Sequence, residues 1–144
     1  MNLQVFSGSR EDVLAYEALV CAGMHPDDVH TPEEFATMIG DGRLQAWWWV
    51  EGDEKVGWCA IYPWHNKFAP QAWHLYGIWV REDWRLKGLG EAMWRFMMEM
   101  VPVGVPMTVS AQPGKLGSEA LVRKYGFEFV CWNAPWNEYV NWNK

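Results

Sequence analysis

The sequence has no apolar run of about 18 residues or more, so it contains no candidate for a membrane-spanning helix. Its first residues lack a basic segment followed by a long apolar one, and we therefore expect no secretory signal. Cysteine is scarce as well. Cys21, Cys59 and Cys131 are widely spaced and odd in number, which fits reduced thiols better than a disulfide framework or a zinc site. Together these absences predict a cytoplasmic protein.

Basic residues are in deficit. The chain has 12 lysines and arginines against 18 aspartates and glutamates, a formal net charge of −6 at pH 7. A nucleic-acid surface needs a basic patch that neutralises phosphates, so we expect no nucleic-acid partner. The acidic balance favours a cationic or amine-bearing partner, a small molecule or a protein substrate. The oligomeric state stays open, with a homodimer as one alternative.

Tryptophan, in contrast, is abundant, with 12 residues. Indole rings fill cores and interfaces, which is the first interpretation; a stacking platform for a sugar or a base is the second. Trp47, Trp48 and Trp49 are consecutive on an expected strand, where side chains alternate between faces, and this weakens a continuous platform. With 50% hydrophobic and 21% charged residues, the chain is expected to form one globular domain over residues 1–144.

Local signals predict the element order β-α-α-β-β-β-α-β-α-β-β. Ser9 offers an N-cap to a helix that ends near Gly23. Thr31 caps a second helix, which has Pro32 in its first position and ends at Gly40. Strands are expected over residues 3–6, 43–50, 55–62, 72–81, 107–111, 127–133 and 136–142, and further helices over 89–100 and 115–125.

Several of these strands are apolar on both faces, which indicates a sheet covered on each side by helices. Gly77 interrupts the strand over residues 72–81, and such a glycine often marks a bulge. The helix over residues 89–100 carries an apolar stripe that we expect in the core, formed by Leu89, Ala92, Met93, Phe96, Met97 and Met100.

The most informative segment is the loop Arg85–Gly90, between the strand that ends near Val80 and an amphipathic helix. It contains two glycines, two cations and no acidic residue. Such a loop leaves backbone N–H groups free at a helix N-terminus, where the helix dipole also favours negative charge. The loop is therefore expected to bind a phosphate or pyrophosphate. The dinucleotide fingerprint fits less well, because Met93 stands where its third glycine would be.

The pattern Arg-x-x-Gly-x-Gly over Arg85–Gly90, together with the order of elements, resembles the GNAT N-acetyltransferase family over essentially the whole chain. The resemblance implies an α+β fold, a twisted and mostly antiparallel sheet of six or seven strands with helices on both faces. It also implies acetyl-CoA as co-substrate, no metal, and transfer of the acetyl group to a primary amine by direct attack. It does not identify the acceptor.

The resemblance assigns the cofactor-binding residues. In this family acetyl-CoA lies between the fourth and fifth strands, which splay apart. The pyrophosphate would be held by the loop backbone, with charge from Arg85 and Lys87, and the pantetheine arm would pair with the backbone around Val80. The N–H of Ile78, freed by the expected bulge, would polarise the thioester carbonyl. The full set is Ile78, Val80, Arg85, Leu86, Lys87, Gly88, Leu89, Gly90 and Ser118; Leu86 replaces a frequent glycine.

The resemblance also suggests catalytic residues. Many members carry a general base about six residues before the valine of this strand, where His74 stands here, and an ordinary histidine titrates near neutrality. A purely structural His74, or a base at His65, are the alternatives. The acceptor pocket is expected to include His25, His30, His65 and Tyr76.

The second family signature is Leu121–Phe127, in which Val122 occupies the place of a tyrosine that protonates the leaving thiolate in many members. Tyr125, three residues on, is the nearest candidate acid. This departure supports an alternative function, a GNAT-fold protein with little or no catalysis that serves as a binding or assembly subunit. A metal site from Cys21, His25 and Asp28 has no accepted ligand spacing, so we expect none.

Overall fold

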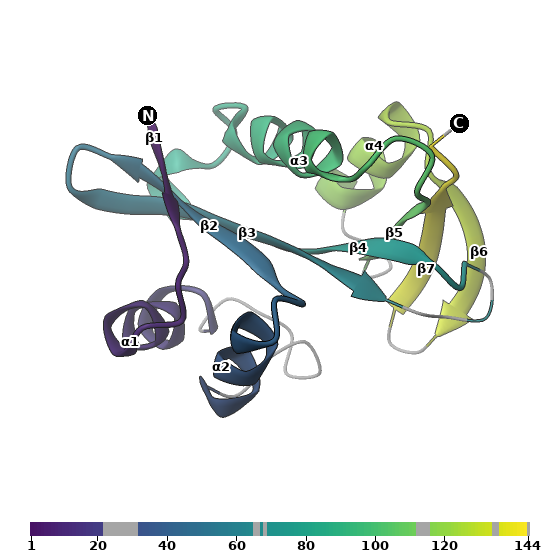
Figure 1. The fold of residues 1–144 in the computed structure, drawn as a ribbon. Helices are drawn as coiled ribbons and strands as arrows, with labels where there is room; N and C mark the ends of the chain where they lie inside the picture. Colours follow the sequence, from purple (N-terminus) through teal and green to yellow (C-terminus); the bar gives the residue numbers. More distant parts are fainter. Residues whose placement is uncertain (22–31, 65–66, 68, 112–115, 134–135, 144) are drawn as a thin grey trace. The chain divides into compact units, whose positions relative to one another are not determined.

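The computed structural model describes residues 1–21, 32–64, 67, 69–111, 116–133 and 136–143 (Figure 1). The predicted element order is confirmed, with one additional 3-10 turn, η3. The elements are β1 (Asn2–Val5), α1 (Arg10–Leu19), α2 (Pro32–Gly40), β2 (Gln45–Glu51), β3 (Glu54–Trp64), β4 (Ala72–Val80), η3 (Glu82–Trp84), α3 (Leu89–Met100), β5 (Met107–Ala111), α4 (Leu116–Lys124), β6 (Glu128–Asn133) and β7 (Trp136–Asn141).

The seven strands form one sheet in the order β1-β2-β3-β4-β5-β7-β6. β1 with β2, β2 with β3, β5 with β7 and β6 with β7 pair antiparallel, whereas β4 and β5 run parallel. The prediction of a mostly antiparallel α+β sheet is therefore confirmed.

The chain divides into two compact units. Unit 1 comprises Met1–Ile61 and Gly77–Met93, and unit 2 comprises Tyr62–Tyr76 and Trp94–Lys144. That residues 1–144 form a single domain stays a prediction. None of the described helices is long and apolar enough to cross a membrane.

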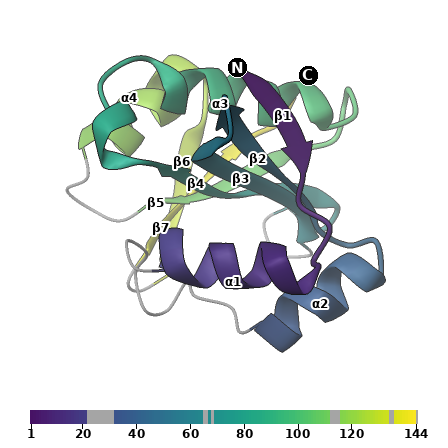
Figure 2. The same cartoon turned by 90° about the vertical axis from the view of Figure 1, so that its left-hand side faces the viewer.

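In unit 1, an aromatic cluster joins α1 to the strands. The ring of Phe6 lies 6.1, 5.9 and 6.0 Å from those of Tyr16, Trp48 and Trp58, and Tyr16 lies 4.9 Å from Trp58. Asp12, in α1, accepts a hydrogen bond from the indole N–H of Trp48 at 3.1 Å. Figure 2 shows α1 and α2 on the same side of β1–β3. The aromatic residues thus fasten α1 to one face of these strands.

The opposite face of β3 in unit 1 contacts the first turn of α3. A Cβ atom added at Gly57 would lie 3.1 Å from Sδ of Met93 and 3.3 Å from Cβ of Trp49. Trp58, the next residue, is fully buried on the α1 side. β3 is therefore covered on both faces, as its apolar sequence predicted, and glycine at position 57 permits the close approach of α3.

The tryptophans of the β2–β3 hairpin are core residues. Trp48 and Trp58 are 0% exposed and Trp47 is 8% exposed, while the indole N–H of Trp49 lies 3.3 Å from Sγ of Cys59. This favours the core interpretation over a stacking platform. The three cysteines form no disulfide.

One part of the predicted α3 stripe is wrong. Met100 is 42% exposed, whereas Trp94, which the stripe omitted, is 5% exposed. α3 ends at Met100. The next residue, Val101, is buried, whereas Met100 is not. In unit 2 the ring of Trp94 packs edge-on against Phe127, with centroids 5.5 Å apart, so this side of the helix also belongs to the core.

Candidate functional site

In unit 1, the loop between η3 and α3 has an unusual backbone. Leu86 and Gly88 have positive φ angles of 62° and 83°, whereas Arg85 is extended with φ −70° and ψ 155°. The carbonyl of Gly88 accepts a hydrogen bond from the N–H of Ala92 at 3.1 Å, so α3 begins directly after it. Alternating backbone conformations before a helix N-terminus turn successive N–H groups toward one side, which favours an anion.

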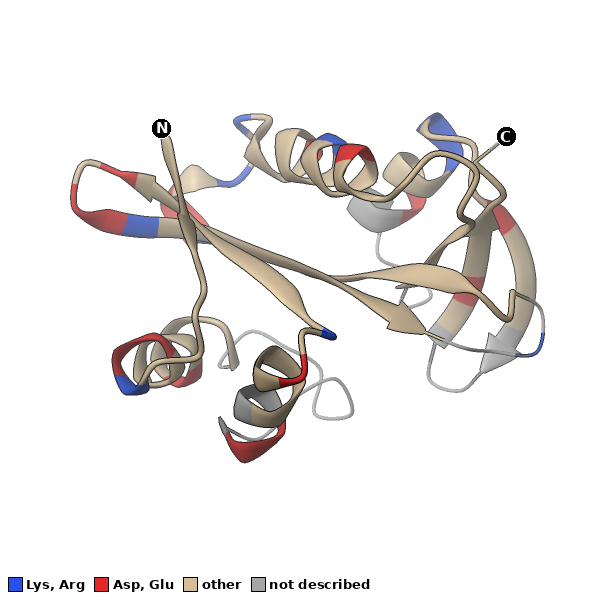
Figure 3. Cartoon of the chain, viewed as in Figure 1, with Lys and Arg blue, Asp and Glu red and all other residues tan. Residues whose placement is uncertain are grey.

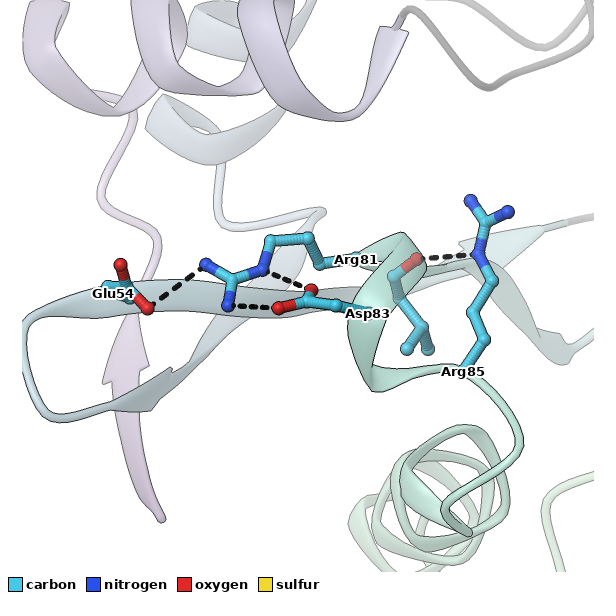
Figure 4. Close-up of polar contacts among 5 residues, drawn as sticks. Glu54, Arg81, Asp83 and Arg85 are labelled. Atoms are coloured by element: carbon cyan, nitrogen blue, oxygen red, sulfur yellow. Dashed lines mark hydrogen bonds and ion pairs between the residues drawn. The ribbon is translucent and has the colours of Figure 1, made fainter.

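The charged side chains of this region have different roles (Figure 4). The guanidinium of Arg81 binds two carboxylates of the chain. Its Nε is 2.6 Å from Asp83, and a second guanidinium nitrogen is 3.2 Å from Glu54. The hydrogen bond with Arg81 lowers the pKa of Asp83 below its usual range. Arg85 donates through Nε to the carbonyl of Val80 at 3.0 Å, and Nζ of Lys87 lies 5.3 Å from the ring centroid of Trp84.

The two cations of the loop, Arg85 and Lys87, thus stand next to the start of α3. Figure 3 shows basic residues in the loop before α3, and mainly acidic residues, with single basic ones, on α1 and around the β2–β3 turn. The loop Arg85–Gly90 thus carries two positive charges, whereas the net charge of the chain is −6.

The glycines of the loop leave room beside the backbone. A Cβ atom at Gly88 would meet nothing within 4 Å, and one at Gly90 would meet only Cγ2 of Val80, at 3.9 Å. A ligand can therefore approach the backbone closely at these two glycines. The backbone, the free space and the two cations fit the pyrophosphate that the sequence predicted for this loop.

Leu86→Gly is expected to stabilise the protein by about 0.5–1 kcal/mol. A leucine in the left-handed region costs about 1–2 kcal/mol, and glycine removes this strain. Part of the gain, about 0.5–1 kcal/mol, is offset because glycine raises the conformational entropy of the unfolded chain. The side chain of Leu86 is fully exposed, so its removal sacrifices no packing. Urea unfolding measures the change. Lys87→Gly is the control: Lys87 does not have a positive φ, and the same replacement there should destabilise.

In unit 2, the parallel pairing of β4 with β5 is short. Among the described residues it comprises the pairs Trp73–Met107 and His74–Thr108. Both strands continue beyond these pairs, β4 to Val80 and β5 to Ala111, and β5 stays paired with β7 along its other edge. The edge of β5 after Thr108 therefore lies outside the ladder with β4, as expected where the two strands part.

His74 stands at the last pair of this ladder. It is 4% exposed, its Nδ1 lies 2.8 Å from Oγ1 of Thr108, and the rings of Tyr62 and Trp64 lie 5.3 and 4.8 Å from it. Burial among these groups lowers the pKa of His74 to about 3, because the charged imidazolium loses its hydration. An ordinary histidine titrates near neutrality, whereas this lowered pKa leaves the imidazole of His74 neutral at pH 7.

This lowered pKa makes stability depend on pH. Between the unfolded value of about 6.5 and the folded value of about 3, the unfolded chain binds a proton at His74 that the folded chain does not. The contribution of this difference to the free energy of unfolding is fully present above pH 6.5 and is lost as the pH falls from 6.5 toward 3. From pH 7 to pH 5, wild type should lose about 2 kcal/mol more unfolding free energy than His74→Asn. Urea unfolding at both pH values gives the comparison. Equal losses would mean that folded His74 titrates normally.

The remaining predicted site residues fall into three groups. Tyr76, two residues after His74 on β4, is 8% exposed with its ring 5.6 Å from that of Tyr62, so the structure brings these aromatic residues and His74 together. Ile78 and Val80 lie on the part of β4 that belongs to unit 1. His25, His30 and His65 lie outside the described residues.

Two residues of the second family signature lie in α4 and directly after it. Val122 is 0% exposed, and Nζ of Lys124 lies 5.7 Å from the ring centroid of Tyr125. Ser118 lies in α4, and its side chain is outside the described part of the chain. The catalytic roles of His74, Ile78 and Tyr125 stay predictions. Among the described residues, no group of three or more potential ligands lies close enough together to hold a metal ion.

Sequence reasoning missed the polar residues of β5 and β7. Thr108 is the partner of His74, and Ser110 binds the buried Glu138 of β7. The available signal was the alternation of hydroxyl and apolar residues in Met107–Ala111, but nothing in the sequence indicated which residues face these hydroxyls.

A mostly antiparallel sheet with helices, and with a glycine-containing loop before α3, is the fold that the GNAT resemblance implied. The sequence profile of the Acetyltransferase (GNAT) family matches residues 13–127, and the chain belongs to this family. The resemblance drawn from Arg85–Gly90 and the element order is therefore confirmed.

Solved structures agree on the fold. A protein of Streptococcus mutans UA159 has a TM-score of 0.78 at 14% identity, with 100% of both chains covered. An N-acetyltransferase of Staphylococcus aureus Mu50 has a TM-score of 0.70 at 17% identity, again with 100% of both chains covered. An aminoglycoside 6'-N-acetyltransferase complexed with coenzyme A has a TM-score of 0.68 at 13% identity, covering 97% of this chain and 94% of that one. No curated protein matches the sequence.

Proposed function

We propose that this protein transfers the acetyl group of acetyl-CoA to a primary amine by direct attack, as a cytoplasmic enzyme. Membership of the GNAT family supports acetyl transfer in general. The observation that carries the proposal for this chain is the loop before α3, where Leu86 and Gly88 adopt positive φ beside two cations and an open space. These features suit the pyrophosphate of a coenzyme A molecule.

Acetyl-CoA would supply the thioester, and the residues of the chain would bind it and handle charge. The loop backbone holds the pyrophosphate, and Arg85 and Lys87 add charge. The N–H of Ile78 donates to the carbonyl oxygen as negative charge develops there. His74 is the proposed base for the proton on the attacking nitrogen.

The neutral state of His74 restricts when that proton transfer takes place. A base whose pKa is about 3 has little tendency to take a proton from a free alkylammonium ion, whose acidity is like that of a lysine side chain. Once the nitrogen has attacked the carbonyl, its protons are more acidic than those of a free alkylammonium ion, so their transfer to a weak base is less unfavourable. In this proposal the acceptor reacts as the free amine, and His74 acts on the nitrogen after it has attacked the carbonyl.

Calorimetry with acetyl-CoA and with CoA is the first test, and a thiol-release assay over a panel of amines is the second. The panel includes a protein N-terminus, lysine, a polyamine, an amino acid and an aminoglycoside, the last because one similar structure is an aminoglycoside acetyltransferase. We expect binding of both cofactor forms and thiol release with at least one amine. Binding of neither form below millimolar concentration would reject the proposal.

A further inference from the structure

Two hydroxyl residues interrupt the otherwise apolar strand β5 in unit 2. Thr108 and Ser110 lie on the same face, because side chains alternate along a strand. Oγ1 of Thr108 is 2.8 Å from Nδ1 of His74 on β4. Oγ of Ser110 donates to the carboxylate of Glu138 on β7, lying 2.9 and 2.8 Å from its two oxygens. The two hydroxyls therefore join β5 to its two neighbours on opposite sides.

Burial of Glu138 at this position is unfavourable for stability. It is 1% exposed, and a carboxylate withdrawn from water is costly unless hydrogen bonds compensate it. An apolar residue of similar size at a buried position commonly gives equal or greater stability. Ser110 and Glu138 are directly opposed in the β5–β7 register, so their hydrogen bond is a cross-strand pair of fixed geometry. A role in positioning accounts for the carboxylate better than stability does.

The place of this pair in the sheet indicates what it positions. Among the described residues, the ladder between β4 and β5 ends at His74 and Thr108, two residues before Ser110. Beyond that point the strand pairing of β5, as far as the described residues show it, is with β7, from Val109 to Ala111. The Ser110–Glu138 hydrogen bond acts on this stretch, immediately after the ladder ends.

We propose that Glu138 is a positioning residue which, through Ser110, holds β5 against β7 beyond the last pair with β4. The inference rests on the proposed function and on the expectation, implied by the family resemblance, that acetyl-CoA lies along the edge of β5 that faces away from β7. The edge of β5 that faces away from β7 then has its binding conformation before the cofactor arrives. Less binding free energy is therefore lost in ordering this strand when the cofactor binds.

Three variants test this role. Glu138→Leu removes the acceptor of the Ser110 hydroxyl, Ser110→Ala removes the donor, and Glu138→Gln keeps an oxygen acceptor without the charge. Asn143→Ala is the matched control, because it removes two hydrogen bonds to the carbonyls of Pro102 and Val105, also in unit 2 but away from this stretch. The measurements are CoA affinity by calorimetry and amide hydrogen exchange at Val109, Ser110 and Ala111 without ligand.

We expect Glu138→Leu and Ser110→Ala to accelerate exchange at these amides and to weaken CoA binding about tenfold or more, as a small misplacement of a binding edge does. Glu138→Gln should stay within about threefold of wild type, because the hydrogen bond survives. The control should change neither quantity, although it loses stability.

Other results contradict the proposal. Unchanged exchange in Glu138→Leu means that the pair does not hold β5, whether or not the protein binds CoA. Wild type that fails to bind CoA rejects the proposed function, while the exchange data still decide the positioning role. If Glu138→Gln instead raises the KM of a cationic acceptor and leaves CoA affinity intact, Glu138 binds the acceptor and the positioning role is wrong.

Discussion

Gly88→Val is expected to abolish binding of CoA and acetyl-CoA. A valine at φ 83° cannot keep the backbone that turns the loop N–H groups to one side, and its β-branched side chain would project into the open space beside the loop. Loss of two charge-assisted hydrogen bonds to phosphate, at about 1.5–3 kcal/mol each, corresponds to an affinity at least about 100-fold lower. Calorimetry with CoA measures this loss directly.

Gly104→Val is a closely matched control. Gly104 has φ 86°, and a Cβ atom there would also meet nothing within 4 Å, but the residue lies between α3 and β5, outside the loop. Both variants should lose about 1–2 kcal/mol of unfolding free energy from the strained backbone. Only Gly88→Val should lose CoA affinity. Equal CoA affinities in the two variants would show that the pyrophosphate does not bind at Arg85–Gly90.

The fold was predictable from the sequence because local chemistry marks its boundaries. Pro32 begins α2, Gly52 adopts the positive φ of the β2–β3 turn, and β5 occupies the predicted residues Met107–Ala111 after Pro106. These signals act within a few residues and need no knowledge of distant contacts. The bounds of α3 were predicted as well, but the burial of its last residue was not. Met100 continues the apolar period of the helix but lies beyond the part that is covered.

The candidate site was predictable only where it is local. The residues of the loop Arg85–Gly90 are consecutive, so the motif that predicts phosphate binding could be recognised from the sequence alone. The environment of His74 depends on Thr108, which is 34 residues away, and Ser110 and Glu138 are 28 residues apart. Such pairs follow from the order of strands and their register, which local patterns do not specify. For the same reason the sequence suggested an ordinary pKa for His74, whereas burial lowers it to about 3.

His74→Ala and His74→Asn are both expected to lower kcat by about 10²- to 10⁴-fold, the usual effect of removing a general base. CoA affinity should be unchanged, because the loop proposed to bind the pyrophosphate lies elsewhere in the sequence and keeps its conformation. The two variants differ in one respect. Asparagine can place a hydrogen-bonding group near the position of Nδ1 and so keep the contact with Thr108, whereas alanine cannot.

That difference separates catalysis from structure. If His74 serves only to hold Thr108, His74→Asn should retain nearly all the activity while His74→Ala loses it, and the proposed base is wrong. If the imidazole takes the proton, both variants should be equally slow, with CoA affinity and cooperative unfolding preserved at pH 7.

The pH profile supplies an independent criterion for the same residue. Because His74 is neutral above about pH 3, its titration produces no inflection in the wild-type rate between pH 5 and pH 8. The free amine is the reactive form, so kcat/KM for an alkylamine should rise about tenfold per pH unit below the pKa of the acceptor. The slope should be the same in His74→Ala, at a lower level. A wild-type inflection near pH 6.5 that disappears in His74→Ala would instead show that the imidazole is hydrated and titrates normally in the working enzyme.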